Sequence, residues 1–144
     1  MTTVKYPVIL IVVFTWIGFV CAISFMEAWL KFQAPGITIP LGLGIGRLVF
    51  SALNKVEWVF AIVVIGNYLF ERNFLWNSEV VYFLIPLFIL LIQSFWLLPA
   101  LDSMAALVIQ GKNLPASNIH IYYVLAEVIK VVCLFMFGIK LFKK

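Results

Sequence analysis

The chain has few charged residues and few of the side chains that bind metals. Only 11% of its 144 residues are charged, and it contains two cysteines and one histidine. One histidine excludes a bis-histidine haem site. The sequence has no Glu-x-x-His motif of a di-iron bundle and no Cys/His set with zinc spacing. Both cysteines fall inside apolar runs, where a disulfide framework is not expected. We therefore expect no cofactor and no metal site.

The charges that are present give a net charge of +4, and no run of basic residues stands out. Clustered Lys and Arg mark nucleic-acid binding, so we expect no nucleic-acid partner. Positive charges beside apolar runs instead serve lipid headgroups and orientation in the bilayer.

Apolar sequence is what the chain has in excess. Hydrophobic residues make up 65% of it and the mean hydropathy is +1.16, which exceeds what a soluble domain of this size needs. A membrane-spanning helix requires about 20 apolar residues. We predict an all-α integral membrane protein, with one domain over residues 1–144, four transmembrane helices in up-down order and no β-sheet. The approximate spans are residues 6–30, 46–70, 80–101 and 118–141.

Four spans place both termini on the same side of the membrane. The cations expected on that side are Lys5, Arg72, Lys140, Lys143 and Lys144. The cations expected on the other side are Lys31, Arg47, Lys55 and Lys112. Because cytoplasmic segments carry the excess of Lys and Arg, we expect a multi-pass protein with both termini in the cytoplasm.

The connection between the first two spans, FQAPGITIPLGLGIG, combines two prolines with four glycines. These residues interrupt helices and strands alike. The remaining residues are mostly apolar, so we expect an irregular loop that rests on the bilayer surface or folds back over the helix ends. Its G-x-G-x-G string has no preceding strand, and we expect no phosphate site there.

The second span carries polar groups whose depth follows from its length. Residues 58–70 make about 20 Å of helix, which is too short to cross about 30 Å of hydrocarbon. The helix therefore extends back to about Ser51, so that Asn54 and Glu57 lie below the headgroups. At about 100° per residue, Arg47, Ser51 and Asn54 share one stripe. A helix lying on the surface would show the same stripe, but it would leave the span too short.

Ionisable residues of the other spans fall at the same end of an up-down bundle. Each such residue costs about 2.5–3.5 kcal/mol on insertion scales and is a functional-site hypothesis by default. We predict a one-sided intramembrane polar pocket, with at least one Lys or Arg within salt-bridge reach of its carboxylates. The predicted ligand-binding residues are Glu27, Arg47, Asn54, Glu57, His120 and Glu127.

This mixture of charges favours a small anionic or amphipathic ligand, held by Arg47 and Lys55, with His120 and the carboxylates moving protons. A hard cation is opposed by the neighbouring basic residues. Ser51 with His120 and a carboxylate allows a nucleophilic site, but we expect no enzyme. Gln93, with its neighbour Ser94, is expected to form hydrogen bonds between helices.

The alternative is a structural or accessory subunit of a larger membrane complex, without chemistry of its own. Carboxylates and basic residues would then pair between helices as structural links. The expected partners under either hypothesis are the lipid bilayer and a second copy or a larger membrane complex.

Four short motifs mark the span ends. SFMEAWLKFQAP closes the first span, GRLVF opens the second, FWLLPALD closes the third and NIHIYYVLAE opens the fourth. The pattern resembles the small four-helix membrane proteins grouped with transmembrane protein 205, a family of unknown function. The positions that match are Phe50, Pro99 and His120. The resemblance implies a four-helix fold and residence in a membrane, and it implies no activity. Glu127 and Lys130 are additional to the pattern.

Overall fold

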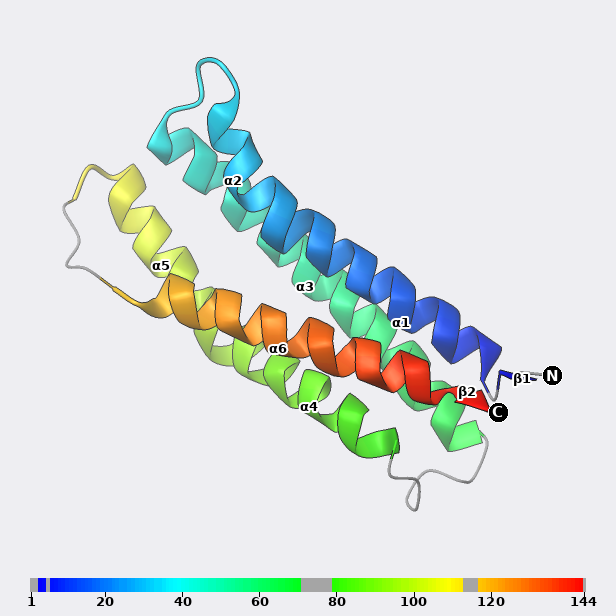
Figure 1. The fold of residues 1–144 in the computed structure, drawn as a ribbon. Coiled ribbons are helices and arrows are strands. Elements are labelled where there is room, and N and C mark those ends of the chain that lie inside the picture. Colours follow the sequence, from blue (N-terminus) through cyan, green and yellow to red (C-terminus); the bar gives the residue numbers. More distant parts are fainter. Residues whose placement is uncertain (1–2, 5, 71–78, 113–116, 144) are drawn as a thin grey trace.

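The computed structural model describes residues 3–4, 6–70, 79–112 and 117–143 (Figure 1). Within these ranges, four helical segments are long and apolar enough to cross a membrane: Pro7–Gln33, Ile39–Phe70, Val80–Ile109 and Ile119–Lys140. Consecutive segments run in opposite directions along the bundle (Figure 1). The predicted all-α, up-down bundle is confirmed, and the protein is a multi-pass membrane protein.

The first and third segments each contain a π-helical turn. The first segment consists of α1 (Pro7–Val20), the π turn η1 (Cys21–Glu27), α2 (Ala28–Leu30) and the 3-10 turn η2 (Lys31–Gln33). The third consists of α4 (Glu79–Ile92), the π turn η3 (Gln93–Leu97) and α5 (Leu98–Ile109). Pro99 is the second residue after η3 and cannot donate a backbone hydrogen bond, which is a common cause of a local change in helix geometry.

The second segment, α3 (Ile39–Phe70), is longer than predicted. It begins at Ile39 instead of residue 46, so the expected loop shrinks to residues 34–38, with Gly36 at a φ of +81°. Pro40 fits the first helical turn, where its missing N–H costs nothing. Gly42 is needed for packing, since a Cβ there would overlap the ring of Phe32.

The third segment also continues beyond its predicted end. The expected connection began at Asp102, but α5 carries the chain through this residue to Ile109. A carboxylate marks the edge of the hydrocarbon without ending the helix, because the backbone hydrogen bonds continue in the headgroup region.

The last segment is α6 (Ile119–Lys140). Beyond it, the two-residue strand β2 (Phe142–Lys143) pairs antiparallel with β1 (Thr3–Val4). This short pairing was not predicted, and it holds the two ends of the chain at one end of the bundle (Figure 1). Lys5, Arg72 and Lys144, which entered the charge count, lie outside the described residues.

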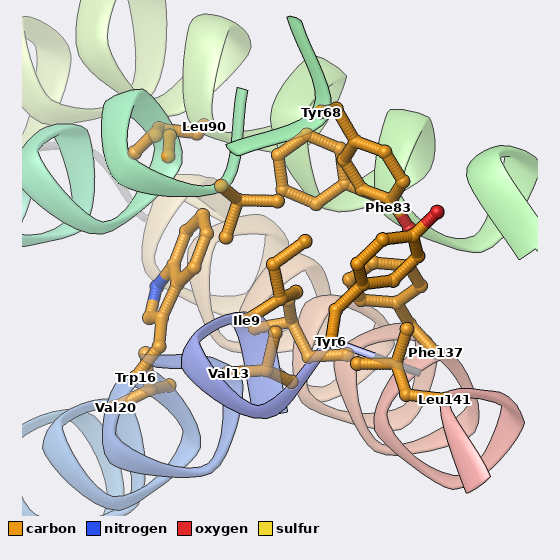
Figure 2. Packing of buried hydrophobic residues seen from close by; sticks show 13 residues of the cluster. Tyr6, Ile9, Val13, Trp16, Val20, Tyr68, Phe83, Leu90, Phe137 and Leu141 are labelled. Atoms are coloured by element: carbon orange, nitrogen blue, oxygen red, sulfur yellow. The ribbon is translucent and has the colours of Figure 1, made fainter. Parts of the chain in front are cut away.

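A dense apolar core fills the half of the bundle nearest the termini (Figure 2). Tyr6, the residue before α1, packs edge-on against Tyr68 of α3, with ring centroids 5.5 Å apart. Phe83 of α4 and Phe137 of α6 have the same centroid separation. Inside a bilayer such contacts act through close packing, because lipid chains are as apolar as the side chains themselves. This half is therefore closed, and the polar groups are left for the other half.

The packing at Gly42 gives a stability prediction with a matched control on the same helix. Replacing Gly44 by Ala should keep or raise the thermal unfolding midpoint in detergent, because Ala favours a helix by about 1 kcal/mol and nothing lies within 4 Å of a Cβ there. Gly42→Ala should have a lower midpoint than Gly44→Ala, since both gain helix propensity but only the Cβ at position 42 has to displace the Phe32 ring. Equal midpoints for the two variants would contradict the packing.

Candidate functional site

Three charged side chains are buried together in the middle of the bundle. Glu57 of α3, and Glu127 and Lys130 of α6, are each at most 1% exposed. The ammonium of Lys130 pairs with Glu57 Oε1 and lies 3.2 Å from Glu127 Oε2. We call these three residues the ion triad. It confirms that a basic side chain lies within salt-bridge reach of the predicted carboxylates.

Two neutral side chains extend the hydrogen bonding to the remaining spans. Gln93 of η3 accepts a bond from Lys130 Nζ at 2.6 Å and donates one to Glu127 Oε1 at 2.9 Å. Trp16 of α1 donates its Nε1–H to Glu57 Oε1 at 2.8 Å. All four spans thus meet at the triad. The interhelical role predicted for Gln93 is confirmed, while Trp16 and Lys130 were not among the predicted site residues.

The triad lies near the middle of the membrane. The 22 residues of α6 make about 33 Å of helix, which matches a hydrocarbon core of about 30 Å. Lys130 comes halfway along α6, so its ammonium is far from both headgroup layers. Because the three side chains are also buried within the bundle, polar groups of neighbouring helices must satisfy one another.

A cavity of about 340 Å³ lies at the end of the bundle away from the termini. Its walls come from α2 and η2, the first half of α3, α5 and the first turn of α6. The volume falls in the range of small-molecule sites. The lining residues are Ala28, Lys31, Phe32, Gly42, Leu43, Gly46, Arg47, Phe50, Ser51, Asn54, Lys55, Leu98, Pro99, Leu101, Asp102, Ala105 and His120.

The charges of the cavity are predominantly positive. Arg47 and Asp102 form a bidentate ion pair, with Nε–Oδ1 and Nη2–Oδ2 distances of 2.5 and 2.9 Å. Lys31 lies 3.1 Å from Glu27 and 5.4 Å from the centroid of the Phe50 ring. The charges cancel within each of these two ion pairs, so the positive charge of Lys55 remains uncompensated. His120 is exposed and also lines the cavity.

Asn54 connects the cavity with the region of the triad. It lines the cavity, and its Nδ2 donates to Ser94 Oγ at 2.9 Å. Ser94 also accepts a hydrogen bond from Trp58 Nε1 at 2.9 Å, and it is the direct neighbour of Gln93 in η3. On α3, Asn54 is one helical turn from Glu57. The cavity floor and the triad are therefore adjacent layers of one polar region.

The structure divides the predicted pocket into these two layers. Three of the six predicted ligand-binding residues line the cavity: Arg47, Asn54 and His120. Glu57 and Glu127 belong to the triad, where Lys130 occupies the space between them. Glu27 is connected to the cavity through its partner Lys31. Helical periodicity places a residue on a face, but it does not say which long side chain of a neighbouring helix reaches that face.

Metal binding and nucleophilic catalysis both depend on how the polar residues are placed. Among the described residues, no group of three His, Cys, Asp or Glu side chains is placed to hold a metal ion. Ser51, His120 and Asp102 all line the cavity. However, Asp102 is engaged by Arg47, and a serine nucleophile needs a hydrogen-bonded base that is oriented by an acid. The binding interpretation needs no such alignment.

Comparison with known proteins adds no assignment. The chain matches no protein-family model, no curated protein and no solved structure. Phe50, Pro99 and His120, the positions that carry the resemblance to the transmembrane protein 205 group, all line the cavity. That resemblance stays a prediction, and the function of the cavity has to follow from its geometry.

Cysteine labelling separates an open cavity from a closed one. In a background with Cys21→Ala and Cys133→Ala, we expect Ser51→Cys to react with a water-soluble maleimide about tenfold faster than two controls on α3, because the reagent needs a hydrated thiolate. The controls are Ala61→Cys, in the buried core, and Val59→Cys, on the lipid-exposed surface. A Ser51→Cys variant as unreactive as Ala61→Cys would show that the cavity is closed.

Proposed function

We propose that the cavity binds a small amphipathic molecule with an anionic group. The observation that carries this proposal is the combination, in one cavity, of excess positive charge with a largely apolar wall. The bilayer and its surface are the natural source of such molecules, and the cavity lies within the part of the bundle that the spans bring to one membrane face.

Electrostatics supports the anionic group. Lys55 is exposed and is paired with no carboxylate among the described residues. The Arg47–Asp102 pair is exposed on both sides, with 36% and 52% of the two side chains accessible. Ion pairs of this kind contribute little stability in water, so Arg47 can exchange Asp102 for a ligand oxygen. A cationic ligand would meet Lys55, Lys31 and Arg47 together.

The apolar wall supports the amphipathic character. Phe32, Phe50 and Leu98 face the cavity together with Pro99. Pockets for small molecules bury most of their ligand against such side chains and use a few polar groups for orientation. An inorganic ion would leave this wall without a partner, whereas a ligand with a hydrocarbon part covers it.

An accessory role is the second candidate, and the closed ion triad favours it. Side chains from all four spans meet there in a set of interactions that needs no ligand. Interhelical polar links of this kind hold bundles together. The exposed apolar residues on the outer faces are also compatible with a second copy or a larger membrane complex, and such a role would leave the cavity without a specific ligand.

We also propose that both termini lie in the cytoplasm, so that the cavity faces the opposite side. Support comes from the excess of Lys and Arg at the terminal end. The same Ser51→Cys variant tests the orientation of the protein in the membrane. A membrane-impermeant maleimide should label it in intact cells. Labelling only in inverted vesicles would place the cavity on the cytoplasmic side.

Binding of dodecyl phosphate to the protein in lipid nanodiscs tests the proposed ligand class. We expect calorimetry to detect binding that Lys55→Gln weakens about tenfold, the order of one charge-assisted hydrogen bond. Inorganic phosphate and dodecanol, which represent the two halves of the probe, should each bind more weakly than the whole.

The control is Lys112→Gln, which removes an exposed cation of the same end outside the cavity lining. It should leave binding of dodecyl phosphate unchanged. An equal loss in Lys112→Gln and Lys55→Gln would assign the effect to general surface charge. Absence of binding to the wild-type protein would favour the accessory role.

A further inference from the structure

The ion triad contains more negative than positive groups. Its two carboxylates, Glu57 from α3 and Glu127 from α6, share the single ammonium of Lys130. The other elements packed against it contribute neutral side chains: Gln93 from η3 and Trp16 from α1. With both carboxyl groups ionised, the described residues around the triad would leave one uncompensated negative charge in the middle of the bilayer, where isolated charge is strongly disfavoured.

Two neutral hydroxyl groups lie beside the Glu127 side of the triad. Glu127 Oε2 lies 3.2 Å from Lys130 Nζ. Tyr123, a buried residue of α6, makes side-chain hydrogen-bonding interactions with Glu127 and with the buried Ser24 of η1. Hydroxyl groups add no positive charge, so they do not compensate the second carboxylate.

The two carboxyl groups are not equivalent. Glu57 Oε1 receives both the Lys130 ammonium and the Trp16 N–H, so its negative charge is directly compensated. Glu127 Oε1 accepts from Gln93 and from Lys130, the latter at 3.3 Å, and Glu127 Oε2 lies 3.2 Å from the same ammonium. A protonated carboxyl oxygen is a donor as well as an acceptor.

We propose that the ion triad is a one-proton site, in which the two carboxyl groups hold one proton between them. The proton comes from a hydronium ion: one of its O–H bonds breaks, one carboxyl O–H bond forms, a water molecule is left, and the triad becomes neutral. The inference stands on the triad alone and does not depend on the ligand proposed for the cavity.

Infrared spectroscopy of the full chain in lipid nanodiscs at neutral pH tests this site. Exposed Asp and Glu are ionised at that pH, whereas a protonated carboxyl group gives a separate C=O band that shifts in D₂O. We expect such a band in the wild-type protein. It should disappear in Glu127→Gln and also in Glu57→Gln, because either change leaves one carboxylate with one ammonium, which is neutral without a proton.

Glu27→Gln is the control, since it removes a carboxylate outside the triad, and it should retain the band. Loss of the band in both triad variants but not in the control supports the proposal. A wild-type protein without the band, or a band that persists in Glu57→Gln at full intensity, overturns it. If the triad variants fail to fold, the wild-type spectrum alone still decides whether a proton is held.

Discussion

The ammonium of Lys130 is the group around which the bundle is organised. It lies at the middle of α6 and pairs with Glu57 of α3 and Glu127 of its own helix, and it donates to Gln93 of the third span. Hydrocarbon offers such groups no substitute partner. The helices must therefore adopt the register in which these side chains meet, and Trp16 adds the first span to the same set.

The two halves of the bundle on either side of Lys130 are packed differently. Toward the termini, aromatic and aliphatic side chains close the interior (Figure 2). On the other side, the third span passes through η3, and α5, which has no buried residue, packs on α3. This arrangement leaves room for the cavity. Both π turns carry polar side chains that point into the bundle, Ser24 in η1 and Gln93 in η3. Such turns frequently occur at functional sites.

Much of the fold followed from length and hydropathy. The minimum length of a span was enough to place Asn54 and Glu57 inside the membrane, and the structure puts both in the polar region of the bundle. The helix ends were less predictable, at Ile39 and at Ile109. Hydropathy marks the thickness of the hydrocarbon, whereas a helix continues into the headgroups as long as its backbone can remain hydrogen-bonded.

The site was predicted less completely than the fold. The predicted site contained the carboxylates of α3 and α6. Lys130 was not among its residues, whereas the structure has it at the centre of the triad. The contact between Trp16 and Glu57 could not be predicted from the sequence, since a tryptophan on an apolar helix has the pattern of any other packing residue. Which side chains meet depends on helix rotation and on the reach of long side chains, and neither follows from one helix alone.

The free energy of unfolding of Lys130 variants tests its organising role most directly. Lys130→Met, measured by denaturant titration in mixed micelles, should lose about 3–5 kcal/mol, because it leaves buried carboxylates without a partner. Combining it with Glu57→Gln and Glu127→Gln removes the unpaired groups, so the triple variant should recover most of that loss, while Lys112→Met should match the wild-type protein. A Lys130→Met variant as stable as the wild type, or a triple variant no more stable than Lys130→Met, would contradict a bundle built around this ammonium.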